Sequence, residues 1–389
     1  MLTSPLPRVI LIDVIAPTLS KAVAKRRLIE LTSLTHTYGG MVVVKLIQKR
    51  NTPDYQTYIG SGKVKEIMEL AEKEAVDLLI VNNLLKPKQL FALEEAFRLH
   101  AKEQTTQYPS RHHRISYPRV WDRIDLILKI FDKHAKTAEA KLQIKLAAIQ
   151  HMGPRIFGMG MELMQQGGGI GTRGQGETNT EVMRRHLAEQ EKQVKKQLAH
   201  LASGRALQRK RRDRLGMKTV SVVGYTNAGK SSLVNALTQK GAYVADALFA
   251  TLDTRVGKLS SPGIPSTILV SDTIGFIQDL PPELISAFRS TLDETIDADL
   301  LLHVIDVSDP YLHEKIKEVE AILKQLHVAD KPKIYVFNKI DLVKRVPKTT
   351  LKKTYADKKP IFVSCVSGNG INDLKEVVAD FQQASSRVF

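Results

Sequence analysis

The stretch "KTVSVVGYTNAGKSSLVNAL" constrains the fold more than any other, because an apolar run leads through a glycine-containing turn into a helical pattern. Residues Gly224 to Ser231 match the spacing G-x-x-x-x-G-K-[ST]. In that pattern the glycines let backbone N–H groups close around phosphates, the lysine reaches the β- and γ-phosphate oxygens, and the last hydroxyl binds Mg²⁺. A strand, such a loop and a helix in this order are typical of α/β domains with a mostly parallel sheet. The sequence therefore predicts a nucleoside triphosphate site formed by Gly224, Tyr225, Thr226, Asn227, Ala228, Gly229, Lys230 and Ser231.

Two later motifs indicate that the base is guanine. The first follows the apolar run "KIYVF" and consists of Asn338, Lys339, Ile340 and Asp341. An aspartate can accept hydrogen bonds from both N1 and N2 of guanine, a pair of donors that adenine does not offer. The second follows the run "PIFV" and consists of Ser364, Cys365 and Val366, where a backbone N–H would donate to guanine O6. On its own "NKID" would fit a polar turn after a strand, but its place after the phosphate loop and "DTIG" favours guanine recognition.

Two segments between these motifs are predicted to respond to the γ-phosphate. The first, "LFATLDTRVGKL", offers the hydroxyl of Thr251 to Mg²⁺, with Thr254 as the alternative. In the second, "DTIG", Asp272 should hold the metal through water, and the Gly275 N–H should contact the γ-phosphate. Its members are Asp272, Thr273, Ile274 and Gly275. The predicted metal ligands are therefore Ser231, Thr251 and Asp272, and the predicted catalytic residues are Lys230, Thr251 and Gly275.

Phe276 follows directly, where many such enzymes carry a glutamine that orients the attacking water. A phenylalanine cannot form a hydrogen bond to water, so we expect slow hydrolysis until a group from elsewhere orders the water or the switch segments. The alternative is that Phe276 is a packing residue and that another side chain, such as Gln278, places the water.

Residues 1–110 alternate apolar runs with helical patterns and predict a small, mostly parallel α/β domain. Within it, "YIGSGKVKEI" resembles a phosphate loop, but it lacks the spacing of the second glycine and a Ser/Thr after Lys63. We interpret it as a turn that leads into an amphipathic helix.

Residues 111–216 are predicted to form a basic helical hairpin. One long amphipathic helix is expected from Trp121 to about Gln150 and a second from near Thr178 to about Arg214, paired antiparallel. The joining segment has seven glycines from Gly160 to Gly176 and carries Arg173, which predicts a flexible cationic tip suited to RNA grooves. The alternative is an ordinary flexible linker.

The positive charge of the chain is concentrated in this region. Of a formal net charge of +17, the segment from Arg98 to Lys218 holds 25 Lys/Arg against 11 Asp/Glu, a surplus of 14. The run "RALQRKRRDR", Arg205 to Arg214, has six cations in ten residues, which repel one another unless a polyanion is near. Charge on a two-helix stem is otherwise usually a solvated face, and this run could also serve as a linker.

Composition limits the compartment. Cys365 is the only cysteine, which excludes an intrachain disulfide and predicts a reducing, cytoplasmic location. The N-terminal apolar run is only about nine residues long and is interrupted by Asp13, so it predicts a strand and not a signal peptide or membrane span, which needs roughly 20.

Beyond the nucleotide motifs, which resemble those of translation-factor-like P-loop GTPases, several stretches resemble the HflX family of ribosome-associated GTPases. They are "YIGSGKVKEI", "WDRIDLILKIFDKHAKTAEAKLQIKLA", "GGGIGTRGQGET", "LFATLD" and "DTIGFIQDLPPELISAFRSTLDE". The resemblance implies a P-loop GTPase domain over residues 217–389, preceded by the small α/β domain and the hairpin. It also implies Mg²⁺-dependent GTP hydrolysis, binding to the large ribosomal subunit and its RNA, and stimulation by ribosomes. Nucleotide contacts are implied for the motifs above and for Phe249, Ala250, Thr251, Leu252 and Asp253.

Two departures from the family pattern concern function. Thr254 and Arg255 follow Asp253 directly, without the usual Pro-Thr, so the first switch segment is shorter. The hairpin reads "GQGETNTE" where the family tends to have Pro and "GETQLE", which would alter the stiffness of the tip.

Three functional hypotheses follow. The first is a GTPase that splits or rescues stalled or idle ribosomes, monomeric when free. The second is a GTP-gated RNA-binding assembly factor or placeholder, in which hydrolysis only resets binding. The third is a GTPase on anionic membrane surfaces, which the absence of a lipidation motif disfavours.

Overall fold

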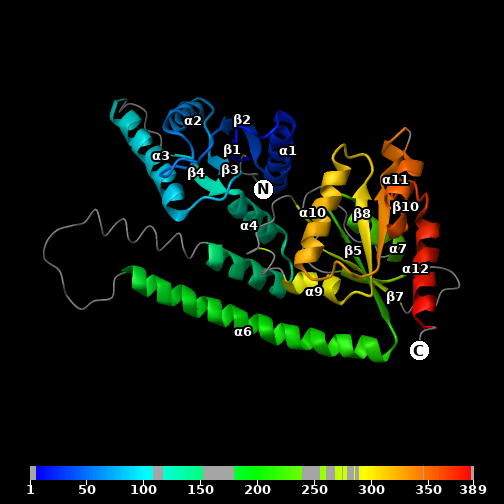
Figure 1. Cartoon of the computed structure of the whole chain (residues 1–389). Helices are drawn as coiled ribbons and strands as arrows, with labels where there is room; N and C mark the ends of the chain where they lie inside the picture. The colour runs from blue at the N-terminus through cyan, green and yellow to red at the C-terminus, as the bar shows by residue number, and fades with distance from the viewer. Residues whose placement is uncertain are drawn as a thin grey trace. The chain divides into compact units, whose positions relative to one another are not determined.

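The computed structural model describes residues 6–107, 117–151, 179–238, 255–259, 268–273, 275–277, 284, 289–344 and 346–386. The chain divides into two compact units, Met1–Lys133 with Lys145–Lys195, and His134–Ile144 with Lys196–Phe389 (Figure 1). The division into domains 1–110, 111–216 and 217–389 stays a prediction.

The first unit contains a four-stranded, wholly parallel sheet in the order β2-β1-β3-β4. The predicted alternation of strands and helices is confirmed, and α2 begins within "YIGSGKVKEI", as expected of a turn that leads into a helix. Alternate side chains of β1 face a core that α2 and α3 share. The elements are β1 Arg8–Ile15, α1 Lys21–Tyr38, β2 Met41–Lys49, α2 Ser61–Lys73, β3 Leu78–Val81, α3 Pro87–Gln107, β4 Arg119–Asp122 and α4 Arg123–His134.

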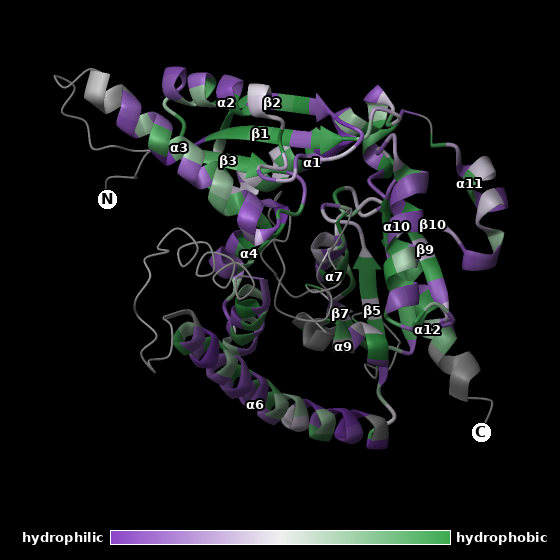
Figure 2. Cartoon of the chain, turned by 60° about the vertical axis from the view of Figure 1, so that its left-hand side comes forward, coloured by the Kyte–Doolittle hydropathy of each residue, from purple (hydrophilic) through white to green (hydrophobic). Residues whose placement is uncertain are grey.

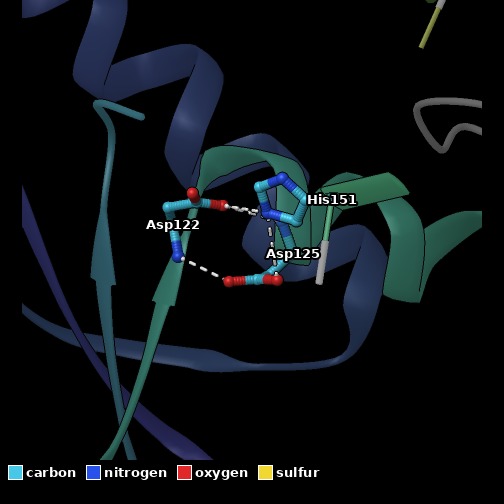
Figure 3. A group of neighbouring side chains, drawn as sticks. All are labelled: Asp122, Asp125 and His151. Carbon is cyan, nitrogen blue, oxygen red and sulfur yellow. Dashed lines mark hydrogen bonds and ion pairs between the residues drawn. The ribbon is translucent and has the colours of Figure 1, made fainter. Parts of the chain in front are cut away.

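The prediction of one unbroken helix from Trp121 was wrong at its start. Trp121 lies in β4, which pairs with β3, and the helix begins only after Asp122. The reason is a reciprocal cap: Asp125 N donates to Asp122 Oδ1 at 2.9 Å, and Asp122 N donates to Asp125 Oδ2 at 3.1 Å (Figure 3). Such a capping box fixes the first turn of a helix. His151 Nε2 lies 3.3 Å from Asp122 Oδ1 and 3.4 Å from Asp125 Oδ1, so a residue of a later helical segment lies next to this cap.

The same prediction was also wrong in the middle of the segment. Helix α4 ends at His134, and helical backbone resumes over residues 138–151. Thr137 starts the second helix, because its hydroxyl accepts a hydrogen bond from Ala140 N at 3.2 Å. The apolar pattern therefore spans two helices and not one, although the segment contains no Gly or Pro, because the side chain of Thr137 caps a new helix.

The two predicted hairpin helices contact each other within each unit. Helix α6 spans Asn179–Arg214. In the first unit, Gln150 Nε2 donates to Glu191 Oε1 at 3.1 Å. In the second unit, Glu139 forms an ion pair with Arg205. Figure 2 shows α6 as hydrophilic along most of its length. No described helix has both the length and the apolar character that crossing a bilayer requires.

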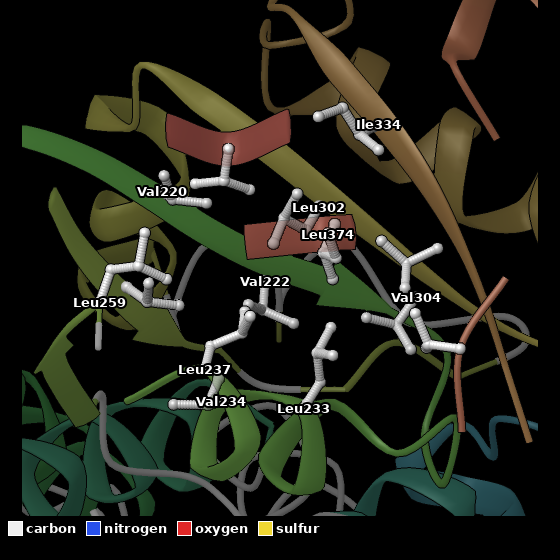
Figure 4. Packing of buried hydrophobic residues seen from close by; sticks show 14 of the residues in the cluster. Val220, Val222, Leu233, Val234, Leu237, Leu259, Leu302, Val304, Ile334 and Leu374 are labelled. Carbon is white, nitrogen blue, oxygen red and sulfur yellow. The ribbon is translucent and has the colours of Figure 1, made fainter. Parts of the chain in front are cut away.

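The second unit holds a six-stranded sheet in the order β10-β9-β8-β5-β7-β6, parallel except for β6 against β7. Helices α7 and α12 pack on one face of the sheet, in the core that Figure 4 shows. Helices α9 and α10 cover the other face. The predicted mostly parallel fold with helices on both faces is thus confirmed. The elements are β5 Lys218–Gly224, α7 Lys230–Thr238, β6 Arg255–Lys258, β7 Ile268–Asp272, α9 Arg289–Asp297, β8 Leu300–Asp306, α10 Leu312–Gln325, β9 Lys333–Asn338, η1 Ile340–Leu342, α11 Lys348–Thr354, η2 Ala356–Lys358, β10 Ile361–Phe362 and α12 Ile371–Ser386.

Candidate nucleotide-binding site

The glycine-containing loop lies between the end of the central strand β5 and the start of α7. Gly224 has φ +149°, and a Cβ there would lie 2.3 Å from the carbonyl oxygen of Val304. Gly229 has φ +93°, and a Cβ there would lie 2.2 Å from Asn338 Nδ2. Both positions therefore require glycine for two independent reasons, backbone conformation and space. The loop ends where α7 begins, so backbone N–H groups and the positive end of the helix dipole can receive an anion.

Lys230 is the buried cation of this loop, with only 7% of its surface exposed. Its Nζ donates to the carbonyl oxygen of Tyr225 at 2.8 Å. Burial lowers the pKa of Lys230 to about 8; the negative charge of Asp272 opposes this shift and the positive charge of Lys339 adds to it. A bound phosphate would add negative charge beside this buried ammonium and further stabilise its charged form.

The "DTIG" segment approaches the same ammonium from the neighbouring strand. Asp272 ends β7 and is 1% exposed. The hydroxyl of Thr273 donates to Val222 O at 2.7 Å and thereby fixes the segment to β5. A Cβ on Gly275 would lie 2.8 Å from Lys230 Nζ and 2.7 Å from Thr226 Cγ2. Glycine at this position is therefore required for the segment to lie against the phosphate loop.

Phe276 is a packing residue. Its N–H donates to Gly224 O at 3.1 Å, and its carbonyl accepts from Thr226 N at 2.8 Å. The side chain is 1% exposed and lies in one buried cluster with Tyr225 and Leu292. Phe276 therefore contributes packing and backbone registration to the phosphate loop, as the packing alternative predicted, and its ring points away from solvent.

We predict that Phe276→Gln destabilises the protein by about 2–4 kcal/mol, because it removes a buried ring and leaves an amide among apolar side chains. Phe276→Leu, which keeps an apolar side chain, should cost about 1–2 kcal/mol. Urea unfolding of the full chain measures both changes. An equal, small effect of the two substitutions would contradict the packing role.

Asn338 joins the phosphate loop to both guanine motifs. Its Nδ2 donates to the carbonyl oxygen of Ala228 at 2.9 Å, and its Oδ1 accepts from Cys365 N at 3.3 Å. The side chain is buried, at 2% exposure. One amide thus connects three segments of the chain: Ala228 lies 110 positions from Asn338 in sequence, and Cys365 lies 27 positions from it.

The remaining guanine-motif residues gather around this amide. Asp341 lies in η1 and is exposed. Burial raises the pKa of the Cys365 thiol to about 12, and the negative charge of Asp341 contributes to this increase as the second cause. Ser364 is fully buried, whereas Val366 is 89% exposed. Asp341 and Cys365, which belong to the two predicted guanine motifs, therefore lie close enough for the carboxylate to act on the thiol.

Part of the predicted site lies outside the described residues. The residues that lie outside are the first switch segment with its alternative threonine and one residue of the "DTIG" motif. The alternative water-orienting residue and the arginine of the hairpin tip also lie outside. Together these residues are Phe249, Ala250, Thr251, Leu252, Asp253, Thr254, Ile274, Gln278 and Arg173.

Sequence reasoning missed two charged residues beside the site. Asp306, the last residue of β8, forms an ion pair with Lys339 at 2.7 Å between Nζ and Oδ2. Lys315 of α10 holds its Nζ 4.4 Å from the centroid of the Tyr225 ring. An acidic residue at the end of the buried run "LLLHVID" was a readable signal for Asp306, because the carboxyl ends of parallel strands border the ligand site. No local pattern pointed to Lys315.

Family models match three consecutive parts of the chain. A model described as GTP-binding GTPase N-terminal matches residues 25–106, one described as GTP-binding GTPase Middle Region matches residues 134–212, and one described as 50S ribosome-binding GTPase matches residues 219–339.

Curated relatives match nearly the whole chain. GTPase HflX of Caldanaerobacter subterraneus subsp. tengcongensis is 42% identical over 349 residues, which cover 90% of this chain and 75% of the relative. GTPase HflX of Escherichia coli strain K12 is 35% identical over 351 residues, which cover 90% of this chain and 78% of that protein. Among solved structures, the SsGBP and GDP complex covers 98% of this chain and 100% of that chain, with a TM-score of 0.53 and 22% identity. At that identity the structural match supports the fold alone.

Proposed function

The chain belongs to the HflX family of GTPases, and we propose that it hydrolyses GTP with Mg²⁺ while bound to the large ribosomal subunit, which stimulates the reaction. The observation that carries the assignment of the site is the bridge through Asn338, which brings the phosphate loop and the guanine motifs together. A buried lysine at the phosphate loop and an exposed aspartate at the guanine motif then meet the two ends of one nucleotide.

The residues near the phosphates suit the roles proposed for them. Lys230 neutralises charge on the β- and γ-phosphates, and the backbone N–H of Gly275 contacts the γ-phosphate. Ser231 and Asp272 offer hydroxyl and carboxylate oxygens, the hard ligands that Mg²⁺ prefers, and Thr251 is proposed to complete the set. When bound, Mg²⁺ supplies positive charge that stabilises the oxygens of the departing diphosphate.

The attacking water requires a group other than Phe276. Because the ring of Phe276 is buried and apolar, it offers no hydrogen bond to water. We propose that contact with ribosomal RNA or protein orders the catalytic segments, so that hydrolysis is slow in the free protein. Gln278 remains the alternative within the chain.

We propose that the exposed cations near the end of α6 contact ribosomal RNA. Lys210, Arg211 and Arg214, called the outer stripe from here on, are exposed and share one face of the helix. Phosphate contacts of this kind dominate affinity for nucleic acid and make it depend on salt.

Replacing all three outer-stripe residues by glutamate tests this contact. We expect binding to large subunits to weaken at least about tenfold at moderate salt, with a shallower salt dependence, because roughly three phosphate contacts are lost. Sedimentation with purified large subunits measures the change. A control with Lys317, Lys352 and Lys353 replaced by glutamate has the same change of charge on exposed positions of α10 and α11. If both variants bind equally well, the proposed contact is wrong.

The finer role that we propose is the splitting or rescue of stalled or idle ribosomes, by a protein that is monomeric and cytoplasmic when free. The alternative is an assembly factor or placeholder whose hydrolysis only resets binding. Light scattering of intact ribosomes, after addition of the protein with a non-hydrolysable GTP analogue, separates the two. A splitter lowers the scattering, whereas a placeholder leaves it unchanged.

A further inference from the structure

The cationic run at the end of α6 divides into two faces. Arg205, Arg209 and Arg212 recur at intervals of four and three residues and therefore share one face of the helix. All three form ion pairs with the chain itself: Arg205 with Glu139, Arg209 with Asp297, and Arg212 with Glu294. The outer stripe lies on a different face and is exposed. Only half of this basic run is therefore available to a polyanion.

Two of these ion pairs connect α6 to α9. Arg212 Nη1 and Nη2 lie 3.3 Å and 3.4 Å from the two carboxylate oxygens of Glu294, which is a two-point contact that fixes orientation. Arg209 Nη1 pairs with Asp297 Oδ2 one turn later in α9. The side chains of all four residues are partly exposed, and ion pairs of this kind add little to folding stability. We therefore expect these ion pairs to affect where α9 lies more than how stable the fold is.

The opposite face of α9 packs on β5, the strand that leads into the phosphate loop, and on the core cluster that contains Phe276. Thr295 is fully buried, and its hydroxyl lies 3.1 Å from the hydroxyl of Ser221 in β5, three residues before Gly224. Leu292 is 2% exposed and belongs to the cluster that contains Phe276 and Tyr225. Helix α9 thus has the stem of α6 on one side and the residues that hold the phosphate loop on the other.

We propose that Arg209 and Arg212 are positioning residues for GTP hydrolysis. They hold α9, and α9 holds Phe276, whose backbone registers the phosphate loop through Gly224 and Thr226. A nucleic acid bound to the outer stripe displaces or stiffens the last turns of α6, and the two ion pairs pass that change to α9. This regulation rests on the proposed function for the identity of the nucleic acid. The coupling within the chain does not depend on it.

Coupling between two sites is reciprocal, so the nucleotide must also affect α6. The test uses hydrogen exchange of the backbone amides of residues 205–214 in the full chain, with GDP and with a non-hydrolysable GTP analogue. We expect the exchange rates in the two states to differ by about threefold or more, and Arg209→Glu with Arg212→Glu to abolish that difference. The matched control, Lys352→Glu with Lys353→Glu, carries the same change of charge on exposed positions of α11 and should keep the difference.

A variant with the charges of both ion pairs exchanged distinguishes the loss of coupling between α6 and α9 from a general loss of structure. Adding Asp297→Arg and Glu294→Arg to the double variant rebuilds both ion pairs in reverse and should restore the nucleotide-dependent exchange. Arg209→Gln with Arg212→Gln repeats the loss without introducing like charges, should the glutamate variant unfold. The proposal is overturned if the wild-type chain shows no nucleotide-dependent difference, if the uncoupled variants keep it, or if the charge exchange fails to restore it.

Hydrolysis measurements add a second readout. In the uncoupled variant, kcat in the presence of large subunits should fall about tenfold, while KM for GTP stays within about twofold. A purely structural defect would instead lower the partner-free rate in parallel. If large subunits do not accelerate even the wild-type chain, the proposed function fails, and hydrogen exchange still decides whether α6 and the nucleotide site are coupled.

Discussion

Replacing Lys230 by alanine is expected to lower kcat/KM for GTP by at least about 100-fold, through loss of charge stabilisation of the β- and γ-phosphates. The ammonium is 7% exposed, lies next to the Gly275 position and has its pKa lowered to about 8 by burial. Removing a buried, desolvated cation should leave the fold intact or slightly more stable, so the loss should be confined to chemistry and phosphate binding. Steady-state phosphate release, together with thermal unfolding, measures both quantities.

Lys317→Ala is the matched control, because Lys317 is an exposed lysine of the same unit on α10. It should keep the rate within about twofold, as surface substitutions usually do. Lys230→Arg keeps the charge but not the shape of the ammonium, and should recover only part of the rate. Full activity in the alanine variant would show that Lys230 does not contact the transferred phosphate.

Replacing Asp341 by asparagine is expected to change the base that the site prefers. A carboxylate accepts from both N1 and N2 of guanine, whereas an asparagine amide can accept from N1 and donate to the O2 of xanthine. Affinity for GTP should fall by about 100-fold or more, and xanthosine triphosphate should become the better ligand, because hydrogen bonds to a charged group are worth about 1.5–3 kcal/mol each. Competition against a fluorescent guanine nucleotide, followed with both triphosphates, measures the exchange.

The control for this substitution is Asp330→Asn, which removes one negative charge from an exposed position of the same unit. It should leave nucleotide preference unchanged. If Asp341→Asn weakens both nucleotides equally, the residue acts on the fold of η1 and not on the base. Asp341 is exposed, so its carboxylate is accessible to a ligand from solvent.

Most of the fold could be predicted because local patterns and tertiary structure agree. The patterns predicted strands for the buried runs of β1 and β5, and the structure has strands there. The glycine-containing loop follows β5, also as predicted. The segment after Trp121 failed because side-chain caps at Asp122 and Thr137, not Gly or Pro, set the helix boundaries. The spacing of Asp122 and Asp125 carried that signal, but the strong apolar periodicity outweighed it.

The site was predictable to the extent that its chemistry is local in sequence. The residues of each nucleotide motif are consecutive, so the sequence alone was enough to predict them. The contacts between motifs, such as the ion pair of Lys339 with Asp306, depend on which strands become neighbours. The division of the cationic run at the end of α6 into two faces also depends on which elements become neighbours in the fold. Helical spacing separates Arg209 and Arg212 from the outer stripe, but only the folded chain identifies the acids of α9 as their partners.

Phe276 illustrates what burial adds to a sequence motif. From the sequence it marks the position of a missing water-orienting group. In the structure its ring packs in the core and its backbone registers the phosphate loop, so the residue has a role of its own. The absence of a hydrogen-bonding side chain at this position nevertheless leaves the dependence on a partner as the central claim.

GTP hydrolysis by the full chain, measured with and without purified large ribosomal subunits, tests that claim most directly. We expect large subunits to raise kcat at least about tenfold, since a partner that completes a GTPase site can contribute orders of magnitude. Small subunits at the same concentration should leave the rate unchanged. A rate that large subunits do not alter, or a free protein that already turns over at the rate of the ribosome-bound protein, would contradict the account.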